Sequence, residues 1–130
     1  MADTLELAQG VTRVAVAVVF VAMGVLHFRP GPAEMMAKLI PPALRRHGIP
    51  SPLNLVRFTG VCEIAGGIGL LIPATQVAAM VGLVLFLIAV FPANSYASQY
   101  PERFGAIAIP FWQRYFAQLA LILVIVLSVV

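Results

Sequence analysis

Charged residues are scarce in this chain, and their scarcity excludes an ordinary soluble domain. They make up 10% of the 130 residues, whereas about 25% is usual in soluble globular proteins. Hydrophobic residues reach 62%, and the mean hydropathy is +1.01. A small soluble domain keeps much of its surface in water and has no means of burying so much apolar surface. We therefore expect lipid to be the solvent of most of these side chains.

Cysteine and histidine are also rare, which limits the chemistry that the chain can carry by itself. Cys62 is the single cysteine, so an intrachain disulfide, a paired-cysteine redox motif and a zinc cluster of cysteines are excluded. A lone thiol in apolar surroundings is inert, and we assign Cys62 to packing. The two histidines, His27 and His47, come with no acidic cluster, so we expect neither a metal site nor a bound haem.

The net charge of +3 does not indicate a nucleic-acid-binding protein. Such proteins carry basic residues mixed with aromatic side chains on an exposed face, whereas the basic residues here lie at the ends of apolar runs. This placement is typical of topology signals and of contacts with anionic lipid headgroups. The lipid bilayer is thus the first partner that the sequence predicts, and nucleic acid is not expected.

Four apolar runs are each long enough to cross a bilayer, which takes about 17 to 25 residues of helix. They predict an all-α fold: an integral membrane four-helix transmembrane bundle, as one domain over residues 1–130. The predicted spans are 11–28, 53–72, 76–94 and 111–130. A tight turn at Pro73-Ala74-Thr75 joins the second span to the third. The first nine residues contain no basic residue, so we expect a retained helix and not a cleaved signal peptide.

The first connection, residues 29–52, contains six of the ten prolines. Between Pro32 and Pro41, apolar residues recur at helical spacing, and Glu34 lies four residues before Lys38. This pattern predicts a short amphipathic helix at the membrane interface. An irregular loop is an equally good interpretation, because Pro41 begins a Pro-Pro pair that stops any helix there.

The distribution of basic residues predicts the orientation of the bundle. With four spans, the two polar connections share one side of the membrane, and seven of the eight basic residues lie within reach of that side. These seven are Arg29, Lys38, Arg45, Arg46, Arg57, Arg103 and Arg114. Arg13 lies on the side of the two termini. By the positive-inside rule we expect a multi-pass protein of the cell membrane, with cytoplasmic connections and both termini outside.

Glu63 interrupts the second span and is the strongest candidate site residue. A carboxylate in a span costs about 2.5–3.5 kcal/mol on insertion scales, and such residues usually face the bundle interior. Gly60 and Gly67 lie near Glu63 on the same helix, and small residues mark where membrane helices approach closely. We expect Glu63 to point at another helix. It is either a functional group or a protonated structural carboxyl that bonds that helix, and the sequence leaves both open.

The other polar groups fall into two layers by their depth in the predicted helices. The cytoplasmic rim contains His27, Arg57, Asn94 and Arg114. Gln118 lies deeper, near the level of Glu63, and Tyr115 is one turn away from Gln118. The predicted ligand-binding residues of a pocket entered from this rim are Glu63, His27, Asn94, Gln118 and Arg57. The simpler alternatives are headgroup anchors for the two arginines and a hydrogen-bonded structural group for the histidine.

Three stretches resemble the DoxX-like membrane proteins: GVLHF at 24–28, TGVCEIAGGIGLLIPAT at 59–75 and FPAN at 91–94. The resemblance covers most of the chain before the fourth span. It implies a four-helix membrane protein, and the family takes its name from the small subunit of an archaeal thiosulfate:quinone oxidoreductase. Related eukaryotic proteins act in receptor assembly. The family motif falls here on His27, Glu63, Gly66, Gly67 and Asn94.

Two functions of different classes follow from these residues and from the resemblance. The first is a non-catalytic membrane subunit of a quinone-linked redox system, in which Glu63, His27 or Gln118 donates hydrogen bonds to a quinone or similar apolar ligand. No covalently bound cofactor is expected, so electrons would come from a partner redox subunit, and the chain is not expected to be an enzyme alone. The second is an assembly factor or scaffold for a partner membrane protein, with Glu63 structural. A homo-oligomer stays open, and a transporter is disfavoured by the lack of an inverted repeat.

Overall fold

The computed structural model describes residues 2–38, 52–96 and 110–130, and the regular structure in these residues is all helical. The helices are α1 (Ala2–Leu26), α2 (Pro30–Ala37), α4 (Pro52–Leu71), η1 (Pro73–Thr75, a 3₁₀ turn), α5 (Gln76–Tyr96) and α7 (Phe111–Leu127). The all-α fold class is confirmed for the described residues, and η1 confirms the predicted tight turn.

Within the described residues, three stretches of helix are long and apolar enough to cross a membrane. They are Asp3–Leu26, Leu53–Leu71 and Pro73–Pro92. The helix predicted as the fourth span, α7, is apolar but has 17 residues. At a rise of 1.5 Å per residue it is about 25 Å long, a little shorter than the roughly 30 Å hydrocarbon core of a bilayer.

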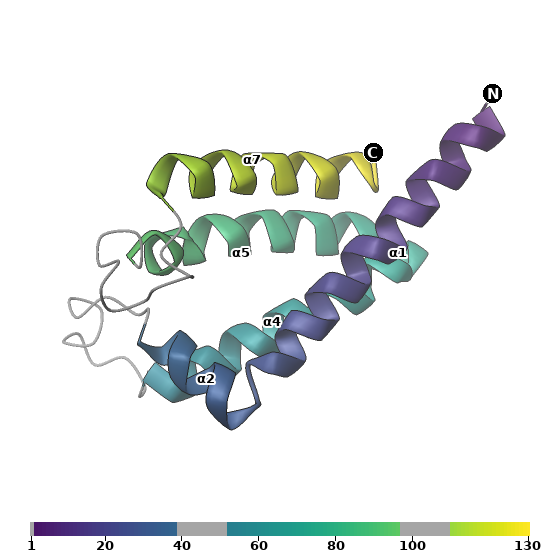
Figure 1. Ribbon diagram of the computed structural model, residues 1–130. Helices are drawn as coiled ribbons and strands as arrows, with labels where there is room; N and C mark the ends of the chain where they lie inside the picture. The colour runs from purple at the N-terminus through teal and green to yellow at the C-terminus, as the bar shows by residue number, and fades with distance from the viewer. Residues whose placement is uncertain (1, 39–51, 97–109) are drawn as a thin grey trace.

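The four long helices run alternately up and down (Figure 1). Figure 1 shows α1 alongside α4, and α5 alongside α7. The end of the bundle where α1 and α5 finish and where α4 and α7 begin also carries α2, and we call it the connection end. The opposite end carries η1 and both chain termini, and we call it the terminal end. The first helix, α1, and the last helix, α7, therefore belong to one bundle, and the chain begins and ends at its terminal end.

A small apolar core joins all four long helices. Its buried members are Val16, Phe20, Leu70, Leu83, Leu87 and Ile125. Many other large apolar side chains point outward, among them Leu85 at 60% exposure and Leu123 at 58%. A soluble domain rarely exposes contiguous apolar surface on this scale. The outward faces of the helices are therefore suited to lipid.

Glycines let α4 approach both of its neighbours. A Cβ atom at Gly67 would lie 2.9 Å from the Ala17 carbonyl oxygen of α1. The adjacent Gly66 faces the other way, where a Cβ would collide with the Leu83 side chain of α5. Successive residues of a helix point about 100° apart, so this Gly-Gly pair serves two interfaces at once. Close approach through small residues is how helices pack in lipid, where the hydrophobic effect gives no drive for them to associate.

The first helix and the first connection differ in part from the predictions. α1 begins at Ala2, well before the predicted start at residue 11. The helix extends beyond the apolar run on which the prediction was based, and Asp3 is favourable in its first turn. α2 confirms that the connection is helical between Pro32 and Ala37, but it begins already at Pro30, since proline is well suited to the first helical position. It packs Ala33 against Val56 of α4. The rest of this connection lies outside the described residues.

Two polar side chains of α1 bond the end of α7, which the sequence analysis did not anticipate. The Nε2 atom of Gln9 donates to the carbonyl oxygen of Leu127 at 3.0 Å, and the Nε atom of Arg13 donates to that of Ser128 at 2.9 Å. The last carbonyls of a helix lack partners within the helix and carry partial negative charge. Gln9 and Arg13 supply such partners, and they hold α1 against α7 at the terminal end.

Candidate functional site

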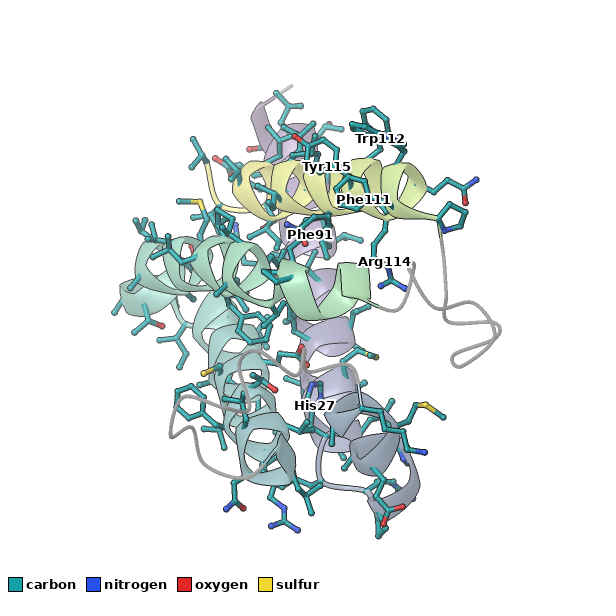
Figure 2. All side chains as sticks on the ribbon, turned by 90° about the vertical axis from the view of Figure 1, so that its left-hand side faces the viewer. His27, Phe91, Phe111, Trp112, Arg114 and Tyr115 are labelled. Carbon is teal, nitrogen blue, oxygen red and sulfur yellow. The ribbon has the colours of Figure 1, made fainter. Side chains whose placement is uncertain are left out.

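His27 and Glu63 lie side by side between α1 and α4. The Nδ1 atom of His27 is 3.6 Å from the Oε2 atom of Glu63, and the two side chains are 10% and 12% exposed. This distance suits an ion pair if the histidine is protonated, but it is too long for a hydrogen bond. The prediction that Glu63 points at another helix is confirmed. Figure 2 shows His27 between α1 and α4, near the connection end.

The glycine contacts set the register that brings the pair together. A Cβ at Gly60 would lie 2.7 Å from the Cβ of His27, so these two positions are directly opposed across the α1–α4 interface. Glu63 is one helical turn further along the same face of α4, and its long side chain reaches back to the histidine. The predicted difference in depth between His27 and Glu63 holds for their backbones, which are about one turn apart, but their side chains meet. Helical rise locates a Cα atom, whereas a glutamate side chain spans much of one turn.

The proton on His27 is assigned by its hydrogen bond. Its Nδ1 atom lies 2.6 Å from the carbonyl oxygen of Met23, one turn back on α1. A backbone carbonyl accepts hydrogen bonds and has no proton to donate, so Nδ1 must carry the hydrogen. In the neutral ring, Nε2 then presents a lone pair. The expectation that His27 is a hydrogen-bonded group is confirmed, and its other nitrogen is left with acceptor character.

One carboxylate oxygen of Glu63 has no hydrogen-bond partner within the part of the chain that the structure describes. Its Oε2 atom is buried from solvent and receives no hydrogen bond from the described residues. A buried polar atom without a partner costs about 1–3 kcal/mol, so most such atoms in proteins are bonded. This unpaired oxygen lies beside His27, whose Nδ1–H is donated to the Met23 carbonyl and not to Glu63. The arrangement is suited to binding a polar group supplied from outside the described helices.

Of the other predicted ligand residues, Arg57 and Gln118 have described side chains, and neither is bonded to this pair. Arg57 is exposed on α4, where its Nη1 atom donates to Asn54 Oδ1 at 3.4 Å. Gln118 is half-buried on α7, and no bond from it to His27 or Glu63 is recorded among the described residues. Asn94 lies near the end of α5, but its side chain is outside the described part of the chain.

Aromatic side chains gather where α5 ends and α7 begins (Figure 2). The rings of Phe111 and Tyr115 are stacked with centroids 6.2 Å apart, and Phe91 of α5 meets Phe111 edge-on at 5.6 Å. Trp112 points away from the bundle and is 65% exposed, whereas Arg114 is directed toward it. Aromatic rings at this level of a helix are typical of the membrane interface.

Among the described residues, the His27–Glu63 pair is neither part of a metal-binding cluster nor located in one of the two surface hollows. Across residues 2–38, 52–96 and 110–130, no group of three or more His, Cys, Asp or Glu side chains is placed to hold a metal ion. Two surface hollows lie elsewhere, at the terminal end, where they are lined in part by Glu6 of α1. The pair lies instead in a glycine-lined helix interface, which makes it the candidate site.

Comparison with known proteins places most of the chain in one family. Residues 16–129 match the profile described as a domain of unknown function, DUF8561. The chain belongs to the DUF8561 family. No curated protein and no solved structure matches it. The matched range includes both residues of the His27–Glu63 pair and reaches from α1 to the end of α7, so the candidate site lies within the DUF8561 domain.

Proposed function

We propose that this DUF8561 protein is a multi-pass protein of the cell membrane that binds an apolar ligand with a hydrogen-bonding head group at His27 and Glu63. In this proposal it acts as a non-catalytic membrane subunit of a quinone-linked redox system. The observation that carries the proposal is the buried Oε2 atom of Glu63, which has no hydrogen-bond partner in the described residues. Ionisable groups at membrane depth are costly, and they mark ligand or proton sites when they are retained.

In the proposed topology all four long helices cross the bilayer. α7 is the shortest, and a bilayer accommodates a short span by local thinning or by interfacial side chains such as Trp112. The connection end faces the cytoplasm, because most basic residues lie on that side. Both termini are then outside. The His27–Glu63 pair would be entered from the cytoplasmic leaflet.

A quinone-like ring is the ligand class that best fits the pair. Such a ligand is apolar, so it partitions into the bilayer, and its ring oxygens need a small number of polar partners in an otherwise apolar slot. The stretch 59–75, which resembles DoxX-like proteins, contains Glu63 and supports a link to quinone chemistry. A partner subunit would supply the electrons.

Ligand-induced stabilisation tests this proposal. The melting temperature of the purified protein would be measured with and without decylubiquinone, in its oxidised and its reduced form. We expect stabilisation of the wild type and of Glu63→Gln, since an amide keeps hydrogen-bonding capacity, and none of Glu63→Leu. Glu34→Gln, at an exposed carboxylate of α2, is the matched control and should respond like the wild type. Equal stabilisation of wild type and Glu63→Leu, or none of any variant, would contradict the proposal.

A scaffold function is the second candidate, and the outer face of α7 favours it. Trp112, Phe116, Leu119, Leu123 and Leu127 form an exposed stripe along the whole helix. Their spacing of three and four residues is the pattern by which one helix packs against another. Co-purification of a stoichiometric membrane partner that is lost in Leu119→Ala/Leu123→Ala, but kept in Glu63→Leu, would favour this candidate.

A further inference from the structure

The hydrogen-bond polarity of the site is fixed by His27. Its Nδ1–H is donated to the carbonyl of Met23, so the histidine has no second proton to offer while it is neutral. Its Nε2 atom is an acceptor, and no bond to it is recorded from the described residues. The ring is nine-tenths buried, so water reaches it poorly. Any ligand that is to satisfy this nitrogen must therefore bring a hydrogen.

The protonation state of Glu63 does not alter that requirement. If Glu63 is ionised, its Oε2 atom is a second acceptor beside the histidine, and a ligand must again donate. If Glu63 is protonated, it donates one hydrogen bond, and a hydroxyl group accepts that bond while donating its own hydrogen to Nε2. A carbonyl or ether oxygen accepts from Glu63 but leaves Nε2 unpaired. A hydroxyl therefore bonds both groups when Glu63 is protonated and one of the two acceptors when Glu63 is ionised, whereas a carbonyl leaves Nε2 unpaired in both states.

We infer that the site discriminates by donor capacity and takes a phenolic hydroxyl, which in a quinone couple means the reduced, quinol form. This inference rests on the proposed ligand-binding function and adds the chemical class of the head group. Specificity of this kind is strong, because a site built to bond a hydroxyl leaves its own buried polar group unpaired when the analogue lacks one. His27 is the residue that sets the preference, and Glu63 is its partner.

The test compares para-heptylphenol with para-heptylanisole, which have the same tail and ring, but the anisole carries a methyl group in place of the donor hydrogen. Binding to the full-length protein in detergent is measured by calorimetry. We expect the phenol to bind about tenfold more tightly than the anisole, the usual effect of one hydrogen bond lost to an acceptor. His27→Phe keeps a ring of similar size without an acceptor, and in this variant the preference should become clearly smaller. Glu34→Gln should keep it.

Nitrogen-15 NMR of labelled histidine gives a second measurement that does not depend on folding of the His27→Phe variant. The chain has two histidines, and His47→Gln leaves the signals of His27 alone. We expect a protonated Nδ1 and a pyridine-like Nε2 whose signal moves when the phenol is added and stays when the anisole is added.

Four outcomes would overturn the inference, and they separate it from the proposed function. Equal binding of phenol and anisole would refute the donor preference while leaving the ligand site intact. A pyridine-like Nδ1, or a phenol preference in His27→Phe as large as in the wild type, would refute the role of His27. No binding of either probe would refute the ligand site and the inference together.

Discussion

Gly24 on α1 and Gly60 on α4 face each other at a distance that leaves no room for a side chain on either. A Cβ at Gly24 would lie 2.8 Å from the carbonyl oxygen of Gly60, and a Cβ at Gly60 would lie 2.9 Å from that of Gly24. Real Cβ atoms almost never come so near to backbone oxygen. This reciprocal contact brings the two backbones together, and it places His27 and Glu63 within reach of each other on the adjacent turns.

The same close packing continues at Gly67, and substitution there tests it. Gly67→Ala would place a Cβ 2.9 Å from both the Ala17 carbonyl oxygen and the Val21 side chain, so α1 and α4 must separate. We expect a loss of about 1–3 kcal/mol, the usual cost of overpacking. Gly82→Ala on α5 is the matched control, because no atom lies within 4 Å of its added Cβ. The measurement is the free energy of unfolding in mixed micelles, and a Gly67→Ala variant as stable as Gly82→Ala would contradict the packing.

Some of the site was predictable from the sequence because its signals are local. The spacing of Gly60 and Gly67 around Glu63 correctly indicated that the carboxyl faces a helix, since i−3 and i+4 positions share a face with i. The pairing with His27 was not predictable in this way. It depends on the register between α1 and α4, which is set by glycine contacts between the two helices and not by the periodicity of either one.

The contact of α1 with α7 escaped prediction for a related reason. Arg13 lies near the start of an apolar run, where a basic residue is naturally interpreted as a topology signal. Its bond to the Ser128 carbonyl depends on where α7 ends in space. Arg57 differs from Arg13 in this respect. It lies six residues before Glu63, which places it on another face of α4, and its side chain is exposed and bonds Asn54 of the same helix.

Removal of the Arg13 side chain should loosen the terminal end of the bundle. Arg13→Ala deletes a charged donor to the end of α7, and hydrogen bonds to charged groups contribute about 1.5–3 kcal/mol. We expect a stability loss of that size in an unfolding titration. Arg57→Ala is the control, since that side chain is exposed and bonds Asn54 on its own helix, and it should change stability little. Equal effects of the two substitutions would show that the Arg13 bond does not stabilise the bundle.

Trp112 reports on the position of α7, because it is the single tryptophan of the chain and is exposed. In lipid vesicles we expect its fluorescence to be quenched more by bromine atoms near the headgroups than by bromine atoms near the bilayer centre. The control is Leu119→Trp in a Trp112→Phe background, about 10 Å further along the helix, which should reverse that order. Strong quenching of Trp112 by aqueous acrylamide and none by brominated lipid would place α7 outside the membrane.

Site-directed labelling of intact cells checks the orientation of the bundle. Single cysteines would be introduced at Asp3 and at Glu34 in the Cys62→Ser background, because both positions are exposed and lie at opposite ends of α1 and its connection. We expect an impermeant maleimide to react with the Asp3 site from outside and with the Glu34 site after permeabilisation alone. Reaction of the Glu34 site in intact cells would reverse the orientation that the basic residues predict.

Infrared difference spectroscopy of the Glu63 carboxyl tests the central claim most directly, because it observes the orphaned oxygen itself. The vibrational band of Glu63 is assigned as the one that disappears in Glu63→Gln, and spectra are recorded with and without reduced decylubiquinone. The account predicts that the ligand shifts this band in the wild type and that the shift is lost in Glu63→Gln and reduced in His27→Phe. A ligand that stabilises the protein while the Glu63 band stays unmoved would contradict the account, because the ligand would then bind elsewhere.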